Sequence, residues 1–272
     1  MTTEVLSRIA TIVVVGEPDR LKEGAAALES TGDMAAVLTI LISTGDDPAP
    51  PIRRLEHAVV LEGLHPQFVN NAVAALRLSS LPTLVWWRGG DPQRLRDLAS
   101  LADRLVLDAS DPWPAWSQSP ALFERTALSD LRWTRLTPWR TLMANFFDSP
   151  DVRATAFDQL LIEGSDAVIA TLYAGWMQAS LASPLRFEHR VVSGAPIHSV
   201  RLKGGGRELD LNLAASGTCV EAAARFGDRA DAARTVMLGD QRLATAIGEE
   251  IRVRARDFAF ERALTKALER PR

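Results

Sequence analysis

The chain of 272 residues is 47% hydrophobic and 24% charged, as is typical of a globular protein long enough for two domains. Its net charge of −3 gives no indication of a partner such as nucleic acid or an anionic membrane. The single cysteine, Cys219, excludes an internal disulfide and a cysteine-built metal site, as expected in a reducing cytoplasm.

The first apolar run, residues 9–15, is too short for a targeting signal and lacks a small-residue cleavage site. Its β-branched residues predict a buried strand that ends at Gly16. No stretch approaches the roughly 18 consecutive apolar residues that a membrane-spanning helix needs. We therefore expect a soluble protein of the cytoplasm.

Strands and helices alternate through the first half of the chain. The strands are expected at 9–15, 35–42, 57–62, 83–88 and 105–108. This alternation predicts a mostly parallel sheet covered on both faces. We therefore expect an α/β fold whose residues 1–125 form a Rossmann-like domain.

The turn after the first strand argues against a nucleotide site in that domain. It has one glycine, Gly16, where the dinucleotide fingerprint has three. Pro18 removes a backbone donor, and Glu17 and Asp19 would repel a pyrophosphate. No GxxxxGK[ST] loop is present either, so we predict no cofactor.

The second half follows a different pattern. Residues 111–118 form a proline- and tryptophan-rich connector without periodicity, and a buried helix is expected at 165–181. Three closely spaced strands are then expected at 187–193, 197–203 and 207–213. They predict an antiparallel meander with one solvated face, within a second, α+β domain of residues 126–272.

Neither half carries a recognisable catalytic motif. The four histidines have no HxH or HxxxH spacing, and no GxSxG turn marks a nucleophile. We therefore predict no catalytic residue and no metal site, although missing motifs lower the odds of an enzyme without excluding one.

The stretch that joins the two halves, residues 128–150, interleaves tryptophans with arginines. Trp133, Arg135, Trp139 and Arg140 lie in this stretch. Tryptophan and arginine often carry the binding energy of protein interfaces. On a helix, Trp133 and Arg140 share one face because they are seven apart, and Arg135 and Trp139 share another because they are four apart.

A second candidate lies where a parallel strand ends, at Trp86, Trp87 and Arg88. Open α/β sheets place ligand or partner sites at this end of their strands. The predicted partner-binding residues are Trp133, Arg135, Trp139 and Arg140, supported by Trp86, Trp87 and Arg88. Packing of these tryptophans in the core is an equal alternative, because tryptophan is usually well buried.

Six stretches, in order along most of the chain, are similar to segments of one known family. They are LPTLVWWRGGDP at 81–92, LADRLVLD at 101–108, DLRWTRLTPWR at 130–140, FDSP at 147–150, YAGW at 173–176 and EEIRVRARDFAFERAL at 249–264. Together they resemble the glucose-6-phosphate dehydrogenase assembly proteins, known as OpcA. The DLRWTRLTPWR block is the most specific of them.

The resemblance implies a non-catalytic protein that binds oligomeric glucose-6-phosphate dehydrogenase. It would promote the assembly or activity of that enzyme, as an allosteric activator, in the oxidative pentose phosphate pathway. The thiol-linked control associated with photosynthetic members needs a cysteine pair, which Cys219 alone cannot form.

The alternative function is an enzyme or binding protein of the same pathway that acts on a sugar phosphate or a nucleotide. The arginines that could hold a phosphate are Arg88, Arg132, Arg135 and Arg140.

Overall fold

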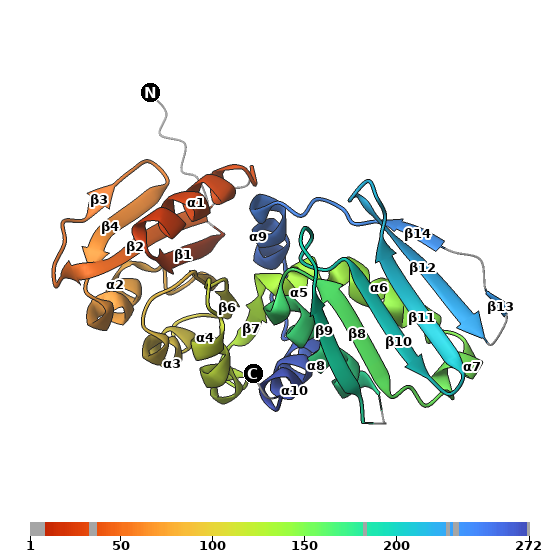
Figure 1. Cartoon of the computed structure of the whole chain (residues 1–272). Helices are drawn as coiled ribbons and strands as arrows, with labels where there is room; N and C mark the ends of the chain where they lie inside the picture. Colours follow the sequence, from red (N-terminus) through yellow and green to blue (C-terminus); the bar gives the residue numbers. More distant parts are fainter. Residues whose placement is uncertain (1–8, 33–36, 182–183, 227–228, 231–233, 271–272) are drawn as a thin grey trace. The chain divides into compact units, whose positions relative to one another are not determined.

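The computed structural model describes residues 9–32, 37–181, 184–226, 229–230 and 234–270. The chain forms two compact units, each with its own sheet (Figure 1). Unit 1 comprises residues 1–131 and 242–257, and unit 2 comprises residues 132–241 and 258–272. Both units are thus discontinuous, whereas the sequence suggested a single division at residue 125.

Unit 1 is built on a sheet of seven described strands (Figure 1). They are β1 (Ala10–Gly16), β2 (Val37–Asp47), β3 (Arg53–Arg54), β4 (Ala58–Leu64), β5 (Thr83–Trp87), β6 (Arg104–Leu107) and β7 (Ala127–Asp130). Their order is β3-β4-β2-β1-β5-β6-β7, and only β3 runs antiparallel to its neighbour. Without β3 this is the doubly wound order of dinucleotide-binding folds, which reverses between β1 and β5.

The helices of unit 1 follow the strands and cover the sheet. They are α1 (Pro18–Glu29), α2 (Val69–Leu76), α3 (Leu95–Ala99), α4 (Trp113–Gln118) and α9 (Leu243–Arg252), with 3-10 turns η2 (Pro66–Phe68), η3 (Pro92–Arg94) and η4 (Ser119–Leu122). Helix α9 packs against α1, and its Ile247 joins Ile12, Val14 and Trp86 in one buried cluster. A segment from far along the chain therefore completes the core of this unit.

A buried ion pair fixes that returning segment. The Glu250 carboxylate on α9 accepts hydrogen bonds from Ser129 Oγ at 2.7 Å and from Arg104 Nε at 2.9 Å. Arg104 Nη1 also donates to the Ala255 carbonyl at 3.1 Å. Since both charged side chains are only 6% exposed, the pair ties residues 242–257 firmly to β6 and β7.

The predicted α/β fold class is confirmed, and the five predicted strands correspond to β1, β2, β4, β5 and β6. Residues 35 and 36 of the second one lie outside the described ranges. Two expectations were wrong. Residues 111–118 are mostly helical, as α4, because a proline in the first turn of a helix breaks no hydrogen bond. Strand β7, which pairs with β6, was not expected at all.

Unit 2 has a second sheet, also of seven described strands (Figure 1). They are β8 (Gln159–Gly164), β9 (Arg186–Val191), β10 (Ser199–Gly204), β11 (Arg207–Leu213), β12 (Cys219–Phe226), β13 (Arg229–Ala230) and β14 (Arg234–Met237). Their order is β13-β12-β11-β10-β8-β9, and β14 also pairs with β12. Of the predicted antiparallel meander, the pairing of 197–203 with 207–213 is confirmed, as β10 and β11, and β12 continues it.

Strand β9 is not part of that meander, contrary to the expectation from sequence. It pairs in parallel with β8, which lies between β9 and β10. Buried Leu160 and Ile162 of β8 stand opposite buried Leu202 and Val200 of β10, which joins four apolar side chains on the covered face. Strand β9 is more exposed and therefore suits the edge.

The helices of unit 2 are α5 (Leu131–Arg135), α6 (Thr137–Phe146), α7 (Pro150–Arg153), α8 (Ala167–Ser180) and α10 (Phe258–Leu268). Only Leu131 of α5 belongs to unit 1. Asp166 caps α8, since its Oδ1 accepts from the backbone N–H of Val168 at 2.9 Å and of Ile169 at 3.0 Å.

Helices α6 and α8 contact the sheet, and α10 packs along α8. No helix among the described residues is long and apolar enough to span a bilayer.

Tyr173, the single tyrosine of the chain, lies on α8 and is fully buried. Its hydroxyl has no hydrogen-bond partner among the described residues. Burial raises the pKa of Tyr173 well above its usual range, and the nearby charge of Arg140 offsets only part of this effect.

We expect Tyr173 to stay protonated in strong alkali until the protein unfolds. The pKa of Tyr173 is raised in the folded state, so its contribution to the free energy of unfolding is constant below the unfolded pKa of about 10 and becomes destabilising as the pH rises above it. Tyrosinate absorbance and circular dichroism should therefore change together in an alkaline titration. Tyrosinate that forms before the circular dichroism changes would contradict the burial of this hydroxyl.

Candidate functional site

The winding of the first sheet reverses between β1 and β5, and doubly wound proteins bind ligands at this point, beyond the carboxyl ends of the strands. Arg88 follows β5 there, and its backbone N–H donates to the Val15 carbonyl at 2.7 Å. The Arg88 residue is only 2% exposed, so its guanidinium needs partners inside the protein.

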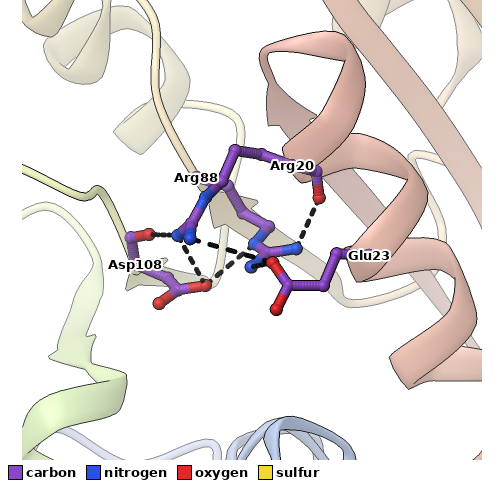
Figure 2. A network of polar contacts seen from close by, with 4 residues as sticks. All are labelled: Arg20, Glu23, Arg88 and Asp108. Carbon is purple, nitrogen blue, oxygen red and sulfur yellow. Dashed lines mark hydrogen bonds and ion pairs between the residues drawn. The ribbon is translucent and has the colours of Figure 1, made fainter.

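Arg88 has three such acceptors (Figure 2). Its Nε donates to Asp108 Oδ2 at 2.8 Å, and Nη2 donates to Glu23 Oε2 at 2.7 Å. Its Nη1 donates to the Arg20 carbonyl. The Arg20 guanidinium lies 3.3 Å from Asp108 Oδ2, so two arginines and two carboxylates balance one another. Strand β6 positions Asp108, and one turn of α1 positions Arg20 and Glu23.

The space beside α1 is filled by Arg88 itself. A Cβ atom at Gly16 would lie 3.2 Å from Arg88 Cβ, and one at Gly24 would lie 3.1 Å from Arg88 Nη1. Helix α1 begins at Pro18, after Glu17, and has no side-chain cap. The fold family implies a dinucleotide at this place, but these residues do not fit one, because a buried arginine and an acidic turn stand where a pyrophosphate would lie.

Both predicted tryptophans of β5 lie in the core. Trp86 is 0% exposed and Trp87 3% exposed, because the sheet is covered on both of its faces. The Arg88 guanidinium carbon lies 4.6 Å from the centre of the Trp86 ring, a cation–π distance. These three side chains therefore hold unit 1 together and offer little surface to a partner.

The tryptophans of α5 and α6 are buried as well, Trp133 at 3% and Trp139 at 5% exposure. The Trp133 ring lies 5.7 Å from that of Phe260 on α10. The guanidinium carbon of Arg140 lies 3.6 Å from the Trp133 ring centre, which confirms that these two residues share a face. Arg140 also donates to Thr137 Oγ1 at 3.0 Å.

Arg135 differs from the other predicted residues. It is half-buried, and it forms no side-chain hydrogen bond or ion pair with the described part of the chain. The seven predicted residues thus fall into one group in each unit, and five of them are nearly inaccessible. Arg135 and Arg140 are the ones with substantial exposed surface.

The sequence analysis missed the partners of Arg88, which are Arg20, Glu23 and Asp108. A weak signal existed, since Asp108 is the last residue of a predicted strand and Arg20 and Glu23 lie three apart, a spacing at which side chains meet on a helix. In the described residues, no group of three or more histidine, cysteine, aspartate or glutamate side chains is placed to hold a metal ion.

The family whose model matches this chain is described as the C-terminal domain of a glucose-6-phosphate dehydrogenase subunit, and the match covers residues 126–264. This is just over half of the chain. The chain belongs to this family, OpcA. The resemblance deduced from sequence motifs is therefore confirmed.

Two relatives carry the provisional name OxPP cycle protein OpcA. The protein of Synechocystis sp. is 30% identical over 134 residues, which are 45% of this chain and 28% of the relative. That of Nostoc punctiforme is 29% identical over 124 residues, or 42% of this chain and 27% of the relative. The chain thus spans less than a third of the length of these OpcA proteins in the alignments.

A crystal structure of similar fold is that of an aldose-aldose oxidoreductase from Caulobacter crescentus complexed with glycerol. It matches 95% of each chain with a TM-score of 0.52 at 8% sequence identity. At this identity the likeness concerns the fold alone. In this OpcA chain, Arg88 fills the place where a doubly wound fold binds a dinucleotide.

Proposed function

We propose that this protein is a non-catalytic assembly factor and allosteric activator of glucose-6-phosphate dehydrogenase. The observation that carries the proposal is the match of residues 126–264 to a family described as a subunit of that enzyme. The Arg88 network supports the non-catalytic part, because it occupies the place where an oxidoreductase of this fold would bind its dinucleotide.

The proposed docking surface includes Arg135 and Arg140, held in place by buried Trp133 and Trp139. Arg135 has no partner among the described residues, so a carboxylate of the dehydrogenase could pair with it. Arg140 is half-buried and already stacks on Trp133, so it combines a fixed orientation with access to a partner. Trp86, Trp87 and Arg88 would act indirectly, by maintaining unit 1.

Kinetics with the dehydrogenase of the same organism test the proposal. The dehydrogenase is titrated with glucose 6-phosphate, with and without this protein, and the complex is followed by size-exclusion chromatography. We expect a complex, together with a change in kcat or in half-saturation. A complex with unchanged kinetics would indicate a purely structural role. Reduction of NADP by this protein alone would instead support an enzyme of the pathway.

An Arg135→Ala variant should bind the dehydrogenase at least ~10-fold more weakly, the loss expected from ~1.4 kcal/mol, and should melt like the parent. The matched control is Arg234→Ala, which removes an exposed arginine of the same unit on β14. The double variant with Arg135→Ala and Arg140→Ala should bind the dehydrogenase still more weakly. It should also lose a little stability, because Arg140 no longer contacts Trp133. Binding equal to that of the parent would place the docking surface elsewhere.

A further inference from the structure

Unit 1 has a hollow of about 470 Å³ at the edge of its sheet opposite the Arg88 crevice. Its walls include the turns that precede β6 and β7, at residues 99–103 and 123–127. Arg77 at the end of α2 and the returning segment after α9 also line it. All these parts belong to one unit.

Four arginines line this hollow: Arg77, Arg125, Arg254 and Arg256. The first three form no side-chain hydrogen bond or ion pair with any residue that the structure describes. The Nε atom of Arg77 is also buried and lacks an acceptor there. A buried donor without an acceptor is costly, so a bound acceptor at this position would be stabilising.

The charge of the hollow is opposite in sign to that of the whole chain. Four arginines stand against two carboxylates, Asp103 and Glu124, which is an excess of two positive charges in a chain of net charge −3. Asp103 is already engaged, since its Oδ2 accepts from the Thr83 N–H at 2.8 Å. Since Arg77, Arg125 and Arg254 have no carboxylate partner among the described residues, the positive charge of the hollow favours an external anion.

We propose that the hollow binds a small phosphate ester. Guanidinium groups match the geometry of phosphate oxygens and bind them through paired hydrogen bonds. A volume of about 470 Å³ exceeds that of a phosphate ion and lies in the range of small-molecule sites. The lining is mostly polar with half-buried Phe123 on one wall, which favours a polar organic body attached to the phosphate.

The arginines of this hollow lie in unit 1, whereas Arg135 of the proposed docking surface lies in unit 2. The hollow is also separate from the Arg88 crevice, because it lies before the amino ends of β6 and β7 rather than beyond the carboxyl ends of the strands. The inference therefore goes beyond assembly of the dehydrogenase and gives the protein a small-molecule ligand of its own.

Isothermal titration calorimetry of the full chain tests it, with glucose 6-phosphate, inorganic phosphate and glucose as probes. We expect glucose 6-phosphate to bind more tightly than inorganic phosphate and glucose not to bind. The double variant with Arg125→Ala and Arg254→Ala removes two exposed arginines. It should bind glucose 6-phosphate at least ~10-fold more weakly and remain folded. Arg96→Ala, an exposed arginine of unit 1 outside the hollow, is the control and should bind like the parent.

Several results would overturn the proposal. They are the absence of binding by glucose 6-phosphate, equal binding by inorganic phosphate, and equal binding by the double variant. A loss of binding in Arg96→Ala would mean non-specific attraction and would overturn it as well. Binding of the dehydrogenase, measured on the same double variant, should be unchanged, so failure of this site and failure of the docking proposal can be told apart.

Discussion

Replacement of Gly175 by alanine should destabilise unit 2 by roughly 3 kcal/mol, the upper end of the usual cost of overpacking. Gly175 lies on α8, where that helix crosses α10. A Cβ atom there would lie 2.2 Å from the Ala263 carbonyl oxygen and 2.8 Å from the Ala267 nitrogen. Both are backbone atoms of a helix, so the two helices would have to separate.

Gly248→Ala is the matched control, because Gly248 is also helical, on α9. The nearest heavy atom to a Cβ there is Thr31 Cγ2, at 3.7 Å. Alanine at this position should be neutral or stabilising by up to about 1 kcal/mol, since it favours the helix. Denaturant titrations followed by circular dichroism compare the two variants with the parent. Equal stability of all three proteins would contradict the close crossing of α8 and α10.

The sequence predicted the elements of the first sheet where burial dictates composition. Strands covered on both faces are continuous apolar runs, as in β1 and β2, and such runs are visible without any structure. Strand β7 was not predicted because its Ser129 and Asp130 are polar. Both are buried and paired through distant contacts, Ser129 with Glu250 and Asp130 with the Trp116 indole at 2.8 Å. Local sequence does not encode such partners.

The discontinuity of the units was hidden for the same reason. The mixed charges of residues 249–257 are typical of a solvated helix surface, yet Glu250 is 5% exposed. Its pairing with Arg104 joins residues 146 positions apart. Charge patterns along a helix show which residues are polar, but not which carboxylate meets a buried guanidinium.

The site was predictable in part. The turn after β1 argued against a dinucleotide, and the structure adds that Arg88 fills the space beside α1. It left open whether the tryptophans are core or surface, and the four in question prove to be buried. Residue type alone could not decide this, because tryptophan serves both roles and its burial depends on what packs against it.

Arg88→Ala should lower the free energy of unfolding by about 3 kcal/mol, as expected when one partner of a buried ion pair is removed. The Arg88 side chain is 1% exposed and that of Asp108 is 10% exposed. Among the described residues, the Asp108 carboxylate would keep Arg20 as its charged partner, at 3.3 Å, and the Trp86 ring would lose the guanidinium that lies against it. Glu23 is 55% exposed, so water replaces its lost contact at little cost.

Arg94→Ala is the control for this variant, because Arg94 forms an ion pair with Asp91 at 3.5 Å in which the side chains are 37% and 33% exposed. Its removal should cost less than about 1 kcal/mol. Arg88→Lys separates charge from shape: a lysine keeps the charge but cannot present a planar fork to three acceptors, so it should restore only part of the loss. If Arg88→Ala instead melts like the parent and loses the dehydrogenase, Arg88 is itself a docking residue, and the crevice rather than Arg135 is where the partner binds.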